Sequence, residues 1–411
     1  MQNHNHTSCA NITSTIVPAR FNIKKIFFTM LFSLYLGLSL IHLCIWPLRV
    51  IILIVTLLGL LALILLSIRI RREDVLAYIY IVFLATSFLI SSLMVGRTGQ
   101  RLYVPIFFII CSPGIAMILI RGYVYSWGGY IVFYGLAVYY FILMLAGFDG
   151  YSASTYGTSV NGIGIVMLVA CISLYIILNM EKKNIDLIPA LITLVISIWG
   201  VGRSAIGASF IILIGLLLIR LRYKPKYIYI VLVCLFVFYL FFDVLCNYLM
   251  DNWFFSNSIM SYLKKAKSEE SSRWPMWVTY YNNLDIFRLI FGVNVVEDRW
   301  AEGTDNEYNY HNSFIHLHIQ TGFMGLITLV LIIFAVFKFY RTNKVFFILL
   351  LAFILRSSTD LFLFFSRFDF IHFFFIFYFL KSTSSSILHI KALSAEEVMV
   401  MPRHPEVVPG V

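Results

Sequence analysis

Apolar segments of membrane-spanning length follow one another along most of this chain, separated by short polar connections. A helix needs about 20 mostly apolar residues to cross the hydrocarbon core of a membrane. The sequence therefore predicts an all-α, polytopic membrane protein of about twelve transmembrane helices with one large outer loop. The expected spans lie near residues 26–46, 50–68, 75–95, 104–120, 128–147, 161–180, 185–199, 204–219, 227–246, 314–337, 345–355 and 368–380.

The composition excludes several other classes of protein. Charged residues make up 12% and hydrophobic residues 61% of the 411 residues, whereas soluble domains contain about 25% charged residues. An ordinary soluble enzyme, a nucleic-acid-binding domain and a disordered scaffold are therefore excluded, although the net charge is +11. The six cysteines have neither CxxC nor Cys/His spacing, so we expect no zinc site and no disulfide framework.

The basic residues predict the orientation of the chain. When they are assigned to alternate sides of the predicted spans, 19 fall on the side of the N-terminus and six in short loops on the other side. Because Lys and Arg concentrate in cytoplasmic loops, both termini are expected in the cytoplasm. Arginine binds phosphate through two parallel hydrogen bonds, although each outer arginine can also simply reach toward lipid head groups. Six more basic residues lie in the one long outer loop, which reports orientation poorly. The six in the short outer loops are all arginines: Arg49, Arg97, Arg101, Arg203, Arg356 and Arg367.

One long hydrophilic segment divides the chain. We expect transmembrane helices in 1–246, a periplasmic loop with amphipathic helices in 247–313, further transmembrane helices in 314–381, and a disordered cytoplasmic tail in 382–411. A loop of this length on a compact bundle is usually functional or disordered. Its many Trp, Tyr and Phe residues favour an ordered cap on the membrane surface.

Three places on the outer side have candidate chemistry. His311 ends the long loop beside a helix start, where an imidazole can act as a base near neutral pH; a histidine bonded to a loop carbonyl is the alternative. Arg203 lies among glycines, which allow a ligand to approach closely. Arg273 lies beside a tryptophan, on which a cation can simply stack. His316 and His318 face different sides of a helix, so we expect them to satisfy polar partners in the bundle rather than to bind a metal with His311.

In order and spacing, these features resemble the O-antigen polymerase and ligase family of bacterial inner-membrane proteins. The similarity covers residues 190–335. It includes a Gly-Arg-Ser sequence at Arg203 between two spans and an Arg-plus-Trp segment at Arg273 and Trp277 early in the outer loop. It ends with His311-Asn312-Ser313 and a span that runs into Gly322-x-x-Gly325.

The resemblance implies a GT-C-type glycosyltransferase that moves a glycan from an undecaprenyl-pyrophosphate donor to an acceptor hydroxyl, without a nucleotide sugar, a metal or another cofactor. Arg203 and Arg273 would bind the donor pyrophosphate, and His311 would deprotonate or orient the acceptor hydroxyl. The implied partners are the lipid-linked oligosaccharide, membrane lipid and a chain-length regulator, with no nucleic acid. Further candidates for the site are Arg97, Arg101, Asn312 and Arg356.

Three functions stay open on these observations. A polymerase adds the glycan to another lipid-linked repeat unit, whereas a ligase adds it to the lipid A core. The compact loop and the Gly-Arg-Ser-Ala sequence around Arg203 favour the polymerase. A lipid-linked oligosaccharide flippase is a more distant alternative, because it would need charged residues along a central cavity rather than at the outer rim.

Overall fold

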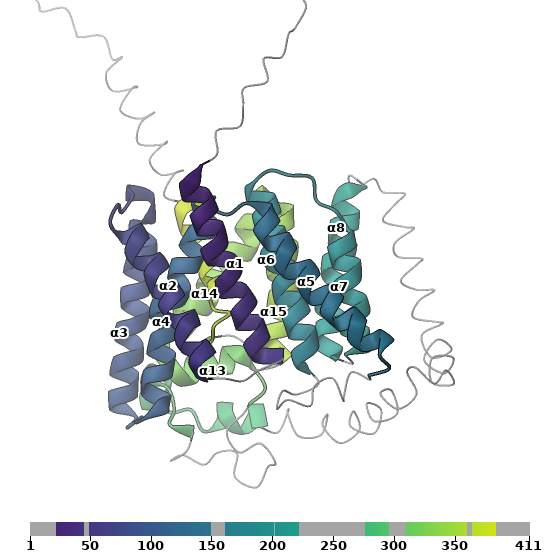
Figure 1. Cartoon of the computed structure of the whole chain (residues 1–411). Coiled ribbons are helices and arrows are strands. Elements are labelled where there is room, and N and C mark those ends of the chain that lie inside the picture. The colour runs from purple at the N-terminus through teal and green to yellow at the C-terminus, as the bar shows by residue number, and fades with distance from the viewer. Residues whose placement is uncertain are drawn as a thin grey trace, which may run out of the picture.

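The computed structural model describes residues 22–44, 49–148, 161–200, 202–221, 276–295, 310–359 and 364–383, and every regular element within these ranges is a helix (Figure 1). Short helices lie between the long ones: η1 (Arg72–Asp74), α11 (Ile286–Phe291), α13 (Ser313–Thr321) and a helix over 276–282. The longer helices are α1 (Ile23–Cys44), α2 (Arg49–Ser67), α3 (Val75–Met94), α4 (Gln100–Ile120), α5 (Ser126–Leu145), α6 (Asn161–Met180), α7 (Ile188–Trp199), α8 (Arg203–Arg220), α14 (Phe323–Thr342), α15 (Lys344–Thr359) and a last helix over Phe370–Thr383.

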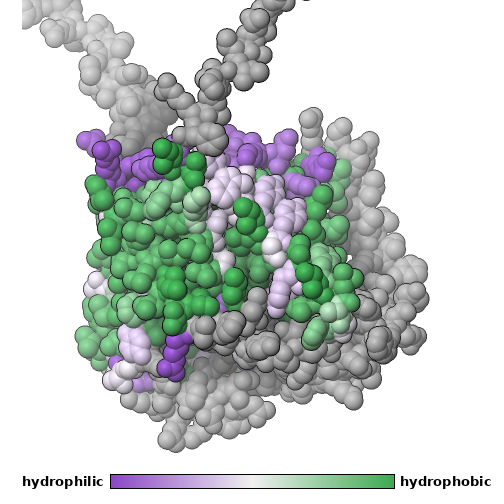
Figure 2. Space-filling model, in the orientation of Figure 1, coloured by the Kyte–Doolittle hydropathy of each residue, from purple (hydrophilic) through white to green (hydrophobic). Residues whose placement is uncertain are grey.

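Seven of the described helices, α1 to α6 and α14, are long and apolar enough to cross a membrane. Their outward faces carry exposed apolar side chains such as Leu53, Val82 and Phe334. Figure 2 shows this surface as a hydrophobic belt that ends at a hydrophilic rim, at the end of the bundle where α1 begins. An apolar belt of this extent on a water-exposed protein would be a liability, whereas lipid solvates it. The fold is that of a polytopic α-helical membrane protein.

The helices lie close to where the sequence predicts them. Ten of the twelve expected spans coincide with single described helices, one is divided as described below, and the remaining one, 227–246, lies outside the described residues. The helix α6 occupies the predicted range 161–180 without a difference. The shorter helices α7, α15 and Phe370–Thr383 have 12, 16 and 14 residues, respectively. The predicted tail 382–411 lies outside the described residues from position 384 onward.

One predicted span is wrong. The sequence predicts one continuous helix over 314–337, but the structure divides it at Gly322 into α13 and α14. Gly322 has a φ of +55°, a left-handed conformation that glycine adopts without steric cost. A Cβ atom at this position would lie 2.0 Å from the carbonyl oxygen of Ile290. The division therefore depends on a close contact with the last turn of the cap helix α11, which hydropathy does not report.

Small residues allow the helices of the bundle to approach closely. A Cβ atom on Gly114 of α4 would lie 2.5 Å from the carbonyl oxygen of Gly59 on α2. A Cβ atom on Gly164 of α6 would lie 2.4 Å from the Cβ of Ala205 on α8. Close backbone approach at small residues is a common way for helices to associate in membranes. The contact of Gly164 with Ala205 fixes α8 against α6. The helix α6 is the most deeply buried of the seven long helices, with 89% of its apolar stretch inside the protein.

Candidate functional site

The two ends of the bundle differ in the residues that the structure describes there. At the end where α1 begins, Lys25 pairs with Glu181 at 2.7 Å, and Lys381 approaches Glu73 to 3.3 Å. At the opposite end lie α13 and the cap helices (Figure 1). The direction of the chain shows that α8 and α14 also begin at that end, and that the last turn of α15 lies there. The assignment of all basic residues to two sides, and which side is cytoplasmic, stay predictions.

Residues 276–295 form an ordered cap beside α3 and α13. The indole Nε1 of Trp277 donates a hydrogen bond of 2.7 Å to the carbonyl oxygen of Tyr310. Apolar side chains of α11, among them Ile286 and Phe287, are exposed, as on a helix lying at a membrane surface. Residues 276–282 and 286–291 are helical, whereas 247–275 and 296–309 lie outside the described residues, and the predicted outer loop as a whole stays a prediction. The buried cluster beneath the cap consists of Met276, Tyr280, Val293, Tyr310, Ile315 and Ile319.

His311 lies half-buried where the cap meets α13. Its φ of +49° is left-handed, a conformation that histidine adopts more often than most residues do. The preceding residue, Tyr310, is held by Trp277. The following residue, Asn312, caps α13 by accepting hydrogen bonds from the backbone amides of Phe314 and Ile315, at 2.9 and 3.2 Å. Neighbours fixed on both sides set the position of the imidazole, and Asn312 has a capping role in the structure.

Arg356 reaches the start of α8. Its guanidinium Nη1 donates a hydrogen bond of 2.8 Å to the hydroxyl of Ser204, the residue after Arg203. The side chain of Arg356 is 1% exposed although it lies in the last turn of α15. A buried ionisable group inside a membrane bundle is costly and is a functional-site candidate by default. The structure thus brings two of the predicted site positions, Arg356 and the helix start at Arg203, together.

The side chains of three predicted site residues lie outside the described part of the molecule. Arg203 begins α8 and Arg101 lies in the first turn of α4, but the side chains of both are outside the described part of the molecule. Arg273 lies wholly outside the described residues. Their predicted roles therefore stay predictions, and only their positions in the chain constrain where they can act.

Arg97 has a use that the sequence did not predict. It is 6% exposed, and its guanidinium donates to the carbonyl oxygens of Gln320 at 2.9 Å and Val293 at 3.0 Å, and also to that of Ile319. A further bond of 3.1 Å reaches the hydroxyl of Ser91 on α3. The side chain joins the end of α3 to the last turn of α13 and to the cap. Its donors are occupied within the protein, so the structure favours a structural role over phosphate binding.

The assignment of His318 to packing is confirmed. The Nε2 atom lies 3.0 Å from the carbonyl oxygen of Leu289, and Nδ1 is hydrogen bonded to the hydroxyl of Tyr280. This arrangement fits a neutral ring, with Nε2 as donor and Nδ1 as acceptor. Burial lowers the pKa of His318, which favours the same neutral form. The ring of His316 packs against that of Phe365, with centroids 6.0 Å apart.

A second polar cluster, which the sequence did not predict, surrounds residues 364–369. The guanidinium of Arg367 donates to Nδ1 of His42, and the Arg367 carbonyl accepts a hydrogen bond of 2.6 Å from the hydroxyl of Tyr35. Asp369 is 1% exposed and accepts a hydrogen bond of 2.6 Å from the backbone amide of Phe365. Arg367 and Asp369 are charged residues in an apolar stretch of the sequence, and such residues indicate a functional site. The contact with His42, 325 positions earlier, was not visible in the sequence.

The start of α13 packs against this second cluster. Phe364 and Phe365 both have left-handed backbones, with φ of +61° and +66°. The ring of Phe314 packs on Phe364 at a centroid distance of 5.8 Å. Non-glycine residues held in this conformation store strain, which is common at ligand sites and switches. The helix that follows His311 therefore connects the cap with the charged interior of the bundle.

The described fold and these clusters define a polytopic α-helical membrane protein with charged groups buried toward one end of its bundle. Comparison with protein-family models, with curated proteins and with solved structures finds no match for the chain. A functional assignment must therefore come from the chemistry of the residues themselves.

Proposed function

We propose that the protein is an O-antigen polymerase of the bacterial inner membrane, which joins undecaprenyl-pyrophosphate-linked glycan units at the periplasmic face. The hydrogen bond between Arg356 and Ser204 carries the proposal. It puts a buried guanidinium beside the first turn of α8, where Arg203 begins the helix. The free amides of a helix start and a pair of arginines together suit an anionic group such as a pyrophosphate.

Each proposed residue has a defined part in the reaction. The acceptor hydroxyl attacks the anomeric carbon of the donor glycan, and His311 takes the hydroxyl proton. The bond between the anomeric carbon and the pyrophosphate oxygen breaks as the glycosidic bond forms. Arg203, Arg356 and, from the outer loop, Arg273 stabilise the charge that develops on the leaving pyrophosphate, an effect that is strong in a site from which water is largely excluded.

The proposal includes an orientation and about twelve spans, with both termini in the cytoplasm and residues 247–313 in the periplasm. The excess of 19 basic residues over six supports it. A single cysteine at position 281, an exposed site on the cap, or at position 267 in a cysteine-free variant would test this orientation. A membrane-impermeant maleimide should label both in intact spheroplasts. Labelling only after permeabilisation would reverse the orientation.

Purified protein in nanodiscs provides the test of the activity. With only lipid-pyrophosphate-linked repeat units present, a polymerase forms a ladder of longer lipid-linked glycans. Product formation that requires added lipid A core would identify a ligase instead. Transfer of intact lipid-linked oligosaccharide between leaflets, without a new glycosidic bond, would identify a flippase and contradict the proposal.

A further inference from the structure

A cleft of about 500 Å³ lies where the end of α3 meets the cap helix α11. Its apolar wall includes Leu93 and Met94 in the last turn of α3, which are 78% and 48% exposed, and Phe287 on α11, which is 45% exposed. A helix that crosses the membrane ends near the border between the hydrocarbon core and the lipid headgroups, and the exposed apolar side chains of α11 fit the same level. The cleft therefore opens toward the headgroup region of the membrane.

Two opposite charges lie in this cleft. The Nη1 atom of Arg288 lies 2.7 Å from Oδ2 of Asp285, and the two side chains are 33% and 53% exposed. A guanidinium has five N–H donors and a carboxylate oxygen has two lone pairs, so both groups can bind a ligand while they remain paired. The other described residues that line the cleft carry no charge. A complementary ligand is therefore one without net charge.

Asn294 adds a hydrogen-bond acceptor to the lining. The residue is 8% exposed, and its Nδ2 atom donates a hydrogen bond of 2.9 Å to the carbonyl oxygen of Val95. Because a carbonyl can bond only to the amino side of the amide, this contact determines the orientation of the side chain. Within the described part of the chain, Oδ1 accepts no hydrogen bond. A buried amide oxygen of this kind favours a hydrogen-bond donor in the cleft.

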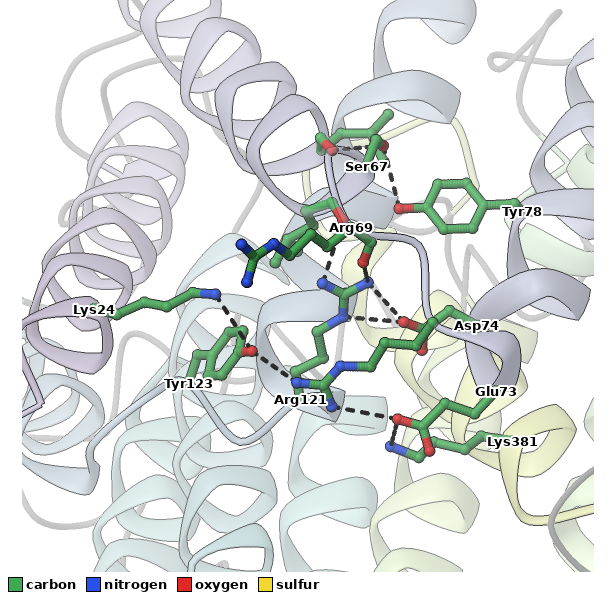
Figure 3. A network of polar contacts seen from close by, with 12 residues as sticks. Lys24, Ser67, Arg69, Glu73, Asp74, Tyr78, Arg121, Tyr123 and Lys381 are labelled. Carbon is green, nitrogen blue, oxygen red and sulfur yellow. Dashed lines mark hydrogen bonds and ion pairs between the residues drawn. The ribbon is translucent and has the colours of Figure 1, made fainter.

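The charged residues at the other end of α3 are arranged differently. There Asp74 accepts hydrogen bonds of 2.6 and 3.0 Å from the guanidinium of Arg121, and both side chains are at most 5% exposed. Figure 3 shows these two side chains pointing toward each other. This pair is closed off within the protein and joins two connections of the bundle. The pair of Asp285 and Arg288, in contrast, is open to a ligand.

We propose that the cleft binds the headgroup of phosphatidylethanolamine, a zwitterionic phospholipid whose amine carries N–H donors. The ammonium group donates hydrogen bonds to the carboxylate of Asp285 and to Oδ1 of Asn294, and the phosphate accepts them from Arg288. The acyl chains lie against the exposed apolar side chains of α3 and α11. An anionic headgroup without an amine would meet the carboxylate, and a choline headgroup has no N–H to donate. The proposal does not depend on the proposed transferase activity, because its test needs no glycan.

Native mass spectrometry of the full-length protein tests this site, with phosphatidylethanolamine, phosphatidylcholine and phosphatidylglycerol of identical acyl chains as probes. The wild type should retain phosphatidylethanolamine preferentially. Asp285→Asn removes the negative charge but keeps a residue that caps α11 equally well. This variant should bind phosphatidylethanolamine about tenfold more weakly, as for the loss of a hydrogen bond between charged groups. It should bind phosphatidylglycerol more tightly than the wild type does, because Arg288 stays and the opposing charge is gone.

Asp186→Asn serves as the matched control. Asp186 also accepts a hydrogen bond from a backbone amide at a helix start, that of Ile188 at 3.2 Å, and it does not line the cleft. This variant should keep the wild-type preference. Equal retention of the three lipids by the wild type would overturn the proposal, as would a uniform loss of all three in Asp285→Asn. A glucosyl diacylglycerol with the same chains is the fourth probe, and its retention in preference to phosphatidylethanolamine would assign the cleft to sugar hydroxyls instead.

Discussion

The guanidinium of Arg356 on α15 donates a 2.8 Å hydrogen bond to the hydroxyl of Ser204 on α8, across 152 positions of the chain. The bond joins a buried cation to the helix that Arg203 begins. An arginine buried in a membrane bundle is costly and is a functional-site candidate. Its guanidinium beside the helix start at Arg203 suits an anionic group such as a pyrophosphate, which is the physical reason to look for pyrophosphate binding here.

The coupling between these two residues is testable by a double-mutant cycle. Ser204→Ala removes the acceptor that orients the Arg356 guanidinium, so we expect glycan transfer to fall by about tenfold, the effect of a hydrogen bond to a charged group. Arg356→Lys should lower it at least as far, and the double variant should fall no further than Arg356→Lys alone. Ser358→Ala is the control, because the Ser358 hydroxyl donates a hydrogen bond of 2.9 Å to a carbonyl of its own helix, that of Leu355. Strictly additive losses would show that the pair does not act together.

Replacement of Arg203 by lysine keeps the charge and removes the planar pair of donors. We expect transfer to fall by about tenfold or more, which corresponds to about 1.4 kcal/mol of lost transition-state stabilisation. The measurement is the rate of glycan extension by purified protein. Arg49→Lys should be silent, because Arg49 is an exposed residue at the start of α2. Small and equal effects at both positions would mean that Arg203 only contacts lipid head groups.

The corner between α13 and α14 should depend strictly on Gly322. Gly322→Ala would place a Cβ atom 2.0 Å from the Ile290 carbonyl oxygen at a φ of +55°, so we expect a loss of roughly 3 kcal/mol or more in stability. Thermal unfolding in detergent provides the measurement. Gly135→Ala in α5 is the control, since its Cβ would have no atom within 4 Å, and it should unfold at or slightly above the wild-type temperature. Equal melting temperatures for the two variants would contradict the observed corner.

The positions of the helices were predictable because a backbone inside lipid must satisfy its own hydrogen bonds, so an apolar stretch of sufficient length forms a helix. The helix α6 matches its predicted range for this reason. The break at Gly322 was not predictable, because its cause is the backbone of Ile290 in a distant segment. Local sequence reports neither contact partners nor close approaches between segments.

The residue types of the candidate site were predictable from the sequence, whereas their contact partners were not. His311 and Arg356 were identified from their positions beside predicted spans, and the structure places them in the fold without assigning them a reaction. The use of Arg97 as a connector between α3 and α13 depends on carbonyl groups more than 190 positions away. The pair of Arg367 and His42 likewise joins distant parts of the chain. In each case the residue type was visible in the sequence, whereas its partner came from tertiary structure.

The hydrogen bonds of Glu181 predict that the stability of the fold depends on pH. Burial alone would raise the pKa of Glu181, but hydrogen bonds from Lys25, Lys183 and the Ser126 amide lower it below its ordinary value of 4.5. Since the folded carboxyl binds its proton more weakly than the unfolded one, this stabilisation is complete above about pH 4.5 and disappears as the pH falls through the lowered pKa. At pH 7 the Glu181→Gln variant should therefore be less stable than the wild type, by about 2 kcal/mol in the free energy of unfolding. The difference from the wild type should shrink below pH 4.5, and a constant difference down to pH 3 would contradict it.

The role of His311 is tested most directly by glycan transfer from a lipid-pyrophosphate donor in nanodiscs, with wild-type protein and His311→Ala compared at equal amounts. A general base contributes about 10²–10⁴-fold, so the variant should retain roughly 1% of the wild-type rate or less. Donor binding should be unchanged, because the arginines still hold the pyrophosphate. Near-wild-type extension of the glycan by His311→Ala would contradict the proposed role of this histidine and the mechanism built on it.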